Sequence, residues 1–159
     1  MTEYRVGTGF DAHALEPGVP LVLGGVSIDH PAGLAGHSDG DVLAHALTDA
    51  VLGAAGLEDI GALFPPGDPG LAGADSVRLL ADAWRRVAGS GWELVNADVL
   101  LIGEEPRLAP HRDAMRARLA GALGVDPERV AVRATTTDGL GFTGRREGLA
   151  AQAVALLQR

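Results

Sequence analysis

The segment SDGDVLAHALTDAVLGAAG, residues 38–56, carries the clearest structural signal in the chain. Its start, Ser38 to Asp41, has the spacing of a capping box, and Gly56 is a typical residue at a helix end. Between them, apolar residues recur at helical spacing: Leu43, Leu47, Ala50, Val51 and Ala54. We therefore predict a helix that begins at Ser38, ends at Gly56 and packs this apolar stripe against a core.

Strands and helices alternate on both sides of this helix. Before it, a short strand is expected from Tyr4 to Phe10, and residues 21–28 are expected to form a hairpin that turns at Gly24-Gly25. After it, we predict a surface loop over 59–73, a helix over 76–87, a strand over 92–102, a helix from Pro110 to about Gly124, and a strand over 129–136. Residues 149–157 fit either a helix or a strand face, and their alanines favour the helix.

This alternation predicts a layered domain of α and β elements with some parallel strand pairing. The length of 159 residues fits one domain. Hydrophobic residues make up 47% of the chain and aromatic residues 4%, so the core must be built from Ala, Val and Leu. Such a core would gain from oligomerisation.

Charge and composition exclude several classes of function. The formal net charge of −8 argues against a general nucleic-acid binder, which needs clustered Lys and Arg. Cysteine is absent, which excludes disulfides, thiolate metal ligands and cysteine nucleophiles. The N-terminal sequence does not resemble a signal peptide, and no apolar run has the length of a membrane span. We expect a soluble, cytoplasmic protein with no membrane partner.

Asp11 and His13 have the i, i+2 spacing that puts two side chains on one face of a strand. Together with His45 they supply one carboxylate and two imidazoles, a set suited to Zn²⁺ with a fourth position open. Polar residues at a strand end can equally be solvated or cap a turn, and that alternative remains open.

His37, Asp41, His45 and Asp49 follow one another at spacings of four residues, which predicts a row of titratable groups along one helix face. A solvated helix face is the alternative, and the capping box already accounts for Asp41. Asp49 lies one turn beyond His45 and could be the outer carboxylate that orients its ring.

The segment ATTTDGLGFTGR, residues 134–145, combines hydroxyls, a carboxylate, glycines and an arginine after a strand. Glycines let backbone N–H groups approach an anion, hydroxyls and arginine bind it, and a carboxylate can hold a bridging Mg²⁺. The alternative is a polar, glycine-rich turn.

These motifs occur in a specific order along the chain: GTGFDAH (7–13), HSDGD (37–41) with His45, DIG (59–61), Phe64-Pro65 with Asp68-Pro69, and TTTDGLGFTG (135–144). Together they resemble the 2-C-methyl-D-erythritol 2,4-cyclodiphosphate synthase family. The resemblance runs from about Arg5 to Leu157. It implies a single cyclodiphosphate synthase domain over 1–159, of the α+β class, with a mixed, mostly four-stranded sheet and packed helices, similar to Bacillus chorismate mutase. It also assigns the tail to a strand.

The resemblance implies a CMP-releasing cyclase, a phosphorus-oxygen lyase of the non-mevalonate isoprenoid pathway. The substrate would be 4-diphosphocytidyl-2-C-methyl-D-erythritol 2-phosphate, and the cofactors Zn²⁺, or another divalent transition metal, with Mg²⁺ or Mn²⁺. It further implies a homotrimer of closely packed sheets with active sites between subunits, and a central channel that could hold an isoprenoid diphosphate.

Carried over by position, Asp11, His13 and His45 match the zinc ligands, Asp138 the ligand of the second metal, and His37 and Thr136 the positions that stabilise the transition state. The positions that match substrate contacts are Ser38, Asp59, Ile60, Gly61, Phe64, Asp68, Gly103, Pro106, Arg107, Leu108, Ala109, Thr135, Thr137, Phe142 and Arg145.

The chain departs from the family pattern at three positions. Asp138 stands where many members have Glu, Gly139 replaces a frequent Lys, and Arg107 replaces a common Lys. Arg107 keeps the charge and adds a bidentate fork. Two other functions fit the same residues: a zinc hydrolase of a phosphoester, and a trimeric binding protein in which zinc is structural.

Overall fold

The computed structural model describes all residues 1–159. Its strands are β1 (Tyr4–Pro17), β2 (Leu21–Leu23), β3 (Val26–Ile28), β4 (Ala32–Leu34), β5 (Glu93–Ile102), β6 (Val130–Thr135) and β7 (Gly148–Gln158). Its helices are α1 (Val42–Ala55), α2 (Ile60–Leu63), α3 (Ser76–Gly89), α4 (Arg112–Leu123) and α5 (Gly141–Gly144), with 3₁₀ turns η1 (Pro69–Leu71) and η2 (Pro127–Arg129). None of the helices has both the length and the apolar composition needed to cross a lipid bilayer.

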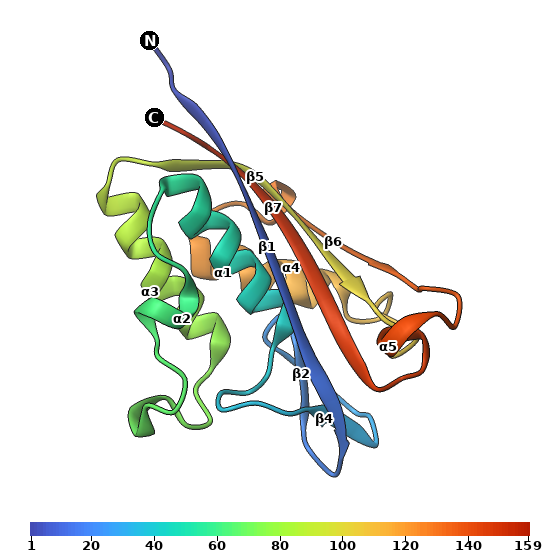
Figure 1. The fold of residues 1–159 in the computed structure, drawn as a ribbon. Coiled ribbons are helices and arrows are strands. Elements are labelled where there is room, and N and C mark those ends of the chain that lie inside the picture. The colour runs from blue at the N-terminus through green and yellow to red at the C-terminus, as the bar shows by residue number, and fades with distance from the viewer.

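The main sheet has the strand order β4-β1-β7-β5-β6 and is mixed (Figure 1). The pair β5 and β6 is parallel, and the other neighbours are antiparallel. This is the expected α+β class with some parallel pairing. The sheet has five strands rather than four because the three-residue strand β4 adds to the edge of β1.

The C-terminal segment is a strand, as the family resemblance implied and contrary to the local helix preference of its alanines. β7 lies between β1 and β5 and pairs with both along most of its length. Leu149, Ala151, Ala153, Ala155 and Leu157 are buried. In that position both backbone edges are hydrogen-bonded and the alternate side chains enter the core, which outweighs the local helix preference of alanine.

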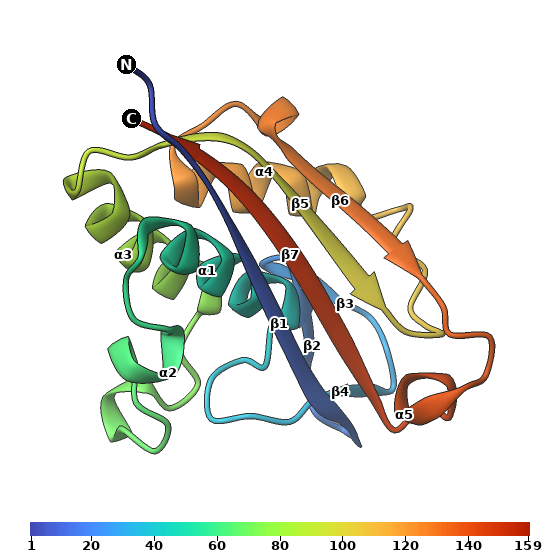
Figure 2. The ribbon, with the colours of Figure 1, turned by 45° about the horizontal axis from the view of Figure 1, so that its top comes forward.

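Helices α1, α3 and α4 lie on one face of the sheet (Figure 2). One cluster of 34 buried hydrophobic residues joins these helices to the strands. Helix α1 crosses β1 and β7 at very short range. A Cβ atom at Gly7 would collide with the carbonyl oxygen of Ala50, and one at Gly9 with that of Ala46. Glycine at both positions therefore allows the helix backbone to rest directly on the strand.

Helix α1 begins at Val42, not at Ser38 as predicted, and its N-cap is Asp41. The Asp41 carboxylate is fully buried and accepts N–H bonds from Gly24 (2.9 Å), Gly25 (2.8 Å) and Ala44 (3.1 Å). Burial raises the pKa of Asp41 to about 6, although these three donors favour the charged form. The same carboxylate thus caps the helix and fixes the hairpin turn, because it satisfies N–H groups of both.

Most other predicted elements lie near their expected positions. The hairpin turns at Gly24-Gly25, α1 ends at Gly56 in the left-handed conformation, and α3, β5 and β6 are found as expected. The predicted third helix begins at Arg112, two residues after Pro110, and the predicted loop over 59–73 contains α2 and η1. The first strand does not end at Phe10 but continues to Pro17.

We predict that Gly9→Ala destabilises the protein by at least about 1–3 kcal/mol, because the added methyl group collides with the α1 backbone. Gly53→Ala is the matched control on the helix side, where a Cβ would meet one atom, the Thr8 carbonyl oxygen, at an ordinary 3.8 Å. That variant should be neutral or more stable by about 0.5–1 kcal/mol. Urea unfolding measures both, and equal stability of Gly9→Ala and wild type would contradict the packing described.

Candidate metal centre

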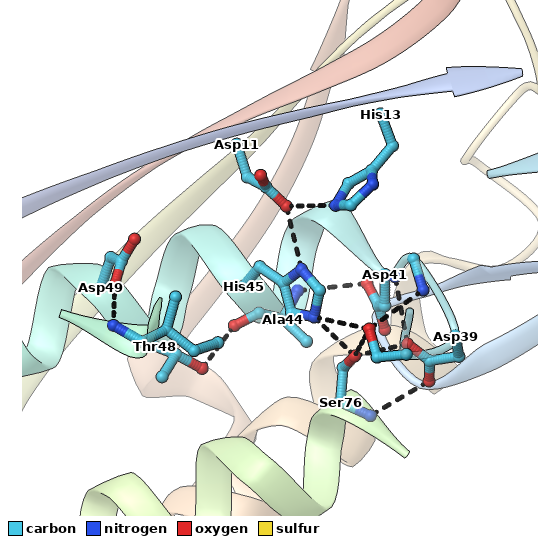
Figure 3. A network of polar contacts seen from close by, with 12 residues as sticks. Asp11, His13, Asp39, Asp41, Ala44, His45, Thr48, Asp49 and Ser76 are labelled. Atoms are coloured by element: carbon cyan, nitrogen blue, oxygen red, sulfur yellow. Dashed lines mark hydrogen bonds and ion pairs between the residues drawn. The ribbon is translucent and has the colours of Figure 1, made fainter. Parts of the chain in front are cut away.

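Asp11, His13 and His45 meet at one point between β1 and α1 (Figure 3). Oδ2 of Asp11 lies 3.0 Å from Nε2 of His13 and 2.9 Å from Nδ1 of His45. One ligand atom from each of the three residues lies within 4.8 Å of the others. Asp11 and His13 share a strand face as predicted, but they lie within β1 rather than at its end, because the strand continues to Pro17.

The ring of His13 is oriented by the backbone of the segment after β4. Its Nδ1 lies 2.6 Å from the carbonyl oxygen of Ala35. A carbonyl oxygen can only accept, so Nδ1 carries the hydrogen in this contact. The neutral ring then has its lone pair on Nε2, directed at Asp11.

The ring of His45 is oriented from α3. Nε2 lies 2.7 Å from Oγ of Ser76 and 3.2 Å from Oγ of Ser38, while Nδ1 faces Asp11. The expectation that Asp49 orients this ring was wrong. Asp49 accepts the N–H of Ile60 at 2.8 Å and so connects α1 to the start of α2.

The charges at this point favour a cation. Burial alone would raise the pKa of Asp11, but hydrogen bonds and charge interactions with His13 and His45 lower it to about 2. The hydrogen bond to Asp11 raises the pKa of His13 above its ordinary value. With the hydrogen of the neutral His13 ring on Nδ1, its Nε2 and the Asp11 carboxylate are both acceptors, so their approach to 3.0 Å requires a proton or a metal ion between them. The donor set fits a divalent metal.

A cleft opens beside the three ligands. Its other lining residues come from the loop before α1, from α2 and η1 with the segment between them, and from α3: His37, Ser38, Ile60, Gly61, Phe64, Pro65, Pro66, Leu71 and Leu79. His37 is exposed, and its Nε2 donates to the carbonyl oxygen of Asp68 at 2.6 Å. The cleft is therefore lined on one side by the three candidate metal ligands and on the other by apolar side chains.

Asp59 and Asp41 do not line the cleft beside the three ligands. Asp59 caps α2 by accepting the N–H of Ala62 at 2.9 Å, and it lines a neighbouring hollow with Asp49 and Phe10. Asp41 does not belong to an exposed row with His37 and His45, because it is turned into the core. The predicted row is therefore broken at Asp41, whereas His37 and His45 both line the cleft.

The remaining candidate residues form a second group, away from the cleft. Gly103 donates its N–H to the carbonyl oxygen of Thr135 at 3.0 Å. Glu104 accepts the N–H groups of Thr137 and Gly139, each at 3.3 Å. These bonds hold the segment after β5 against the segment after β6. These two segments and α5 lie on the opposite side of the ribbon from α2 (Figure 1).

The second group contains Gly103, Pro106, Arg107, Leu108, Ala109, Thr135, Thr136, Thr137, Asp138, Phe142 and Arg145, and none of them lines the cleft beside the metal ligands. Leu108 is buried in the core, so only its backbone is available to a ligand. Arg145 pairs with Glu147 at 2.9 Å. Asp138 has φ +53°, a left-handed conformation that Asp tolerates better than most residues.

Sequence reasoning assigned no role to Ala35 and Ser76, which orient the two imidazole rings, or to Asp39, which accepts from Ser76. Ala35 acts through its backbone and carries no sequence signal. Ser76 and Asp39 are separated by 37 positions, and Glu104 and Thr137 by 33. Local spacing does not predict such contacts.

Comparisons with known proteins agree over nearly the whole chain. A profile of the YgbB family matches residues 4–158. A 2-C-methyl-D-erythritol 2,4-cyclodiphosphate synthase from Moorella thermoacetica is 61% identical over 153 residues, covering 96% of this chain and 94% of that protein. The solved structure of a 2C-methyl-D-erythritol-2,4-cyclodiphosphate synthase in a CDP-bound form is similar with a TM-score of 0.87 and 42% identity, covering 96% of this chain and 99% of that one. The bifunctional IspDF of Campylobacter jejuni has a TM-score of 0.95 and 46% identity, and the match covers 99% of this chain and 43% of that longer chain.

We predict that His45→Ala lowers the metal content of the purified protein far below the wild-type stoichiometry, because a carboxylate and one imidazole remain. His111→Ala is the control, since His111 makes no side-chain capping bond at the start of α4. Elemental analysis of both variants after dialysis decides the matter. Undiminished metal in His45→Ala would remove this residue from the ligand set.

Proposed function

This chain belongs to the YgbB family, and we propose on that basis that it is a 2-C-methyl-D-erythritol 2,4-cyclodiphosphate synthase, as its relatives are named. The observation that carries the proposal is the convergence of Asp11, His13 and His45 beside a cleft. A relative of the same fold is described as bound to CDP, which supports a cytidine nucleotide as the ligand.

The reaction converts 4-diphosphocytidyl-2-C-methyl-D-erythritol 2-phosphate into the 2,4-cyclodiphosphate and CMP. An oxygen of the 2-phosphate forms a bond to the β-phosphorus, and the bond from that phosphorus to the oxygen of CMP breaks. The nucleophile is part of the substrate, so no protein nucleophile is required. The enzyme acts by holding the attacking oxygen and the β-phosphorus in line, which is worth up to about 7–11 kcal/mol when the reactants are well oriented.

Asp11, His13 and His45 are the proposed ligands of Zn²⁺ or a similar divalent metal, and Asp138 is the proposed ligand of Mg²⁺ or Mn²⁺. When bound, such ions neutralise and polarise the diphosphate. The carboxylate and the two neutral imidazoles suit the first ion. A single carboxylate with substrate phosphates suits the second, because Mg²⁺ is commonly held in that way.

The other residues of the cleft bind and enclose the substrate. His37 keeps its Nε2–H on the carbonyl oxygen of Asp68, which holds the imidazole at the mouth of the cleft beside the metal ligands. Phe64 and Ile60 provide apolar contact for the methylerythritol carbons and exclude water from the reacting phosphates. Hydrogen bonding to the phosphate oxygens by Thr136, and by His37 once its Nε2–H turns from Asp68 to the substrate, would stabilise the charge that develops in the transition state.

The residues after β5 and β6 would bind the cytidine and its phosphates. Gly103, Ala109, Thr135 and Thr137 would contact the base, the ribose and the α-phosphate through backbone groups and hydroxyls. Arg107 supplies a positive charge where the family often has Lys, and Gly139 removes one side-chain contact. Asp138 is one methylene shorter than the common Glu, and its carboxylate would hold the second ion together with phosphate oxygens of the substrate.

A homotrimer would join the two groups of residues. Within one chain no residue of the nucleotide-binding group lines the cleft beside the metal ligands, so a single site would take the two groups from neighbouring copies. The helix-free face of the sheet offers the contact surface. Val6 is 65% exposed, Phe10 61% and Val154 39%, and Val6 lies opposite Leu156 in the β1–β7 register. Exposed apolar strands of this kind favour burial against another copy.

The same apolar sheet faces would surround the threefold axis of a closed trimer. A channel formed there could accept the hydrocarbon chain of an isoprenoid diphosphate. Binding of that ligand is a secondary proposal, because it depends on the trimer.

We predict that the purified protein, supplied with zinc, magnesium and the cytidyl substrate, releases CMP and the cyclodiphosphate in equal amounts. The measurement is chromatography of the products with time. Release of inorganic phosphate would instead identify a phosphoester hydrolase that activates water at the metal. Bound metal without turnover would favour a binding protein.

We predict that two impaired variants, His45→Ala and Asp138→Ala, restore activity when they are co-expressed. If each site takes its metal ligands from one subunit and Asp138 from the next, random equal mixing gives one intact site in about four. The co-expressed protein should then reach about a quarter of wild-type activity. Activity no higher than that of the separate variants would contradict a site shared between subunits.

A further inference from the structure

Ser76 and Asp39 form a chain of contacts behind His45 that the function described above does not use (Figure 3). Ser76 is fully buried in the first turn of α3, with its Oγ 2.7 Å from Nε2 of His45. The same Oγ donates a short hydrogen bond to Oδ1 of Asp39. The chain of hydrogen bonds therefore runs from the candidate metal ligand Asp11 to His45, then to Ser76, and ends at Asp39.

The direction of each hydrogen bond follows from the number of hydrogens available. An ionised carboxylate can only accept, and a serine hydroxyl has a single hydrogen. The Ser76 hydroxyl gives this hydrogen to Asp39, which is much closer than its other acceptor, Ser38 Oγ at 3.4 Å. Toward His45 the Ser76 oxygen must then accept. The hydrogen between them belongs to Nε2 of His45.

Asp39 itself cannot easily turn away from Ser76. Its Oδ2 accepts the backbone N–H of Ser76 at 3.1 Å, and its Oδ1 also accepts the N–H of Asp41 at 3.1 Å. The N–H of Asp39 in turn donates to the carbonyl oxygen of Ala74 at 3.1 Å. Backbone groups at the starts of α1 and α3 thus fix the carboxylate, which makes it a rigid acceptor for the hydroxyl.

We propose that Ser76 and Asp39 are positioning residues that hold His45 with its hydrogen on Nε2 and its lone pair on Nδ1, directed at the metal ion. The inference rests on the proposed metal centre. His13 is held in the opposite tautomer, with its hydrogen on Nδ1. The two rings therefore present different nitrogens to one ion, each fixed by a hydrogen bond on its far side. Ser76 contacts neither the metal position nor the substrate, and its effect is transmitted through the imidazole.

Ser76→Ala tests the proposal, because it removes the hydroxyl and keeps the backbone N–H that binds Asp39. Loss of a hydrogen bond behind a ligand imidazole should weaken zinc binding by about 10–100-fold. The affinity is measured by competition between the apo protein and a chromophoric chelator for zinc alone. In the zinc-loaded protein labelled with ¹⁵N-histidine, the Nε2–H proton of His45 should appear as a slowly exchanging, low-field resonance. It should move upfield or disappear in Ser76→Ala.

Ser90→Ala is the matched control, because it removes an exposed hydroxyl at the other end of the same helix, bonded at 3.2 Å to the carbonyl oxygen of Arg86. It should leave both readouts unchanged. Ser76→Thr restores the hydroxyl and should recover the resonance and most of the affinity, and it decides the question if the alanine variant does not fold. Zinc affinity in Ser76→Ala that falls by less than about tenfold, with an unchanged His45 resonance, would overturn the positioning role. Failure of the wild-type protein to bind zinc would overturn the metal centre itself, and with it this inference.

Discussion

The close contact between helix α1 and strand β1 is the constraint on which the site depends. Glycine at positions 7 and 9 lets the helix backbone lie against the strand, where any side chain would collide with Ala46 or Ala50. Asp11 follows directly after this contact on β1, and His45 precedes Ala46 on α1. The two sides of the metal corner are therefore brought within hydrogen-bond distance by packing of the backbone, rather than by the attraction between polar side chains.

Hydrogen bonds of two carboxylates, Asp41 and Asp39, fix the orientation of the segments that the packing of α1 on β1 brings together. Asp41 is buried and joins the start of α1 to the β2–β3 turn, while Asp39 joins the same loop to the start of α3. Each of these carboxylates accepts at least two backbone N–H bonds, so each is held by main chain on more than one element. A fixed loop between β4 and α1 gives fixed positions to His37, which lies in the loop, and to His45, which follows it on α1.

Most of the elements could be predicted from the sequence because they depend on local spacing, whereas the set of Asp11, His13 and His45 was predicted from residue chemistry and from the family resemblance. The i, i+2 relation of Asp11 and His13 and the apolar stripe of α1 are properties of one strand and one helix. The errors have a common cause in contacts between distant segments. Local propensity favoured a helix for the tail, which is the strand that the family resemblance implied because β1 and β5 flank it. Asp49 binds Ile60 instead of His45 because α2 folds back over α1. Ser76 reaches His45 across 31 positions, a relation that no local pattern encodes.

We infer that this packing directs three acceptor atoms at a single metal ion. Two belong to imidazole rings of opposite tautomer and the third to the Asp11 carboxylate. Crystals of the zinc-loaded protein, measured by anomalous diffraction at the zinc absorption edge, test it most directly. We expect a strong peak about 2.0–2.2 Å from the carboxylate of Asp11, Nε2 of His13 and Nδ1 of His45. A peak bound through the other ring nitrogens, or an anomalous map without zinc at this corner, would contradict it.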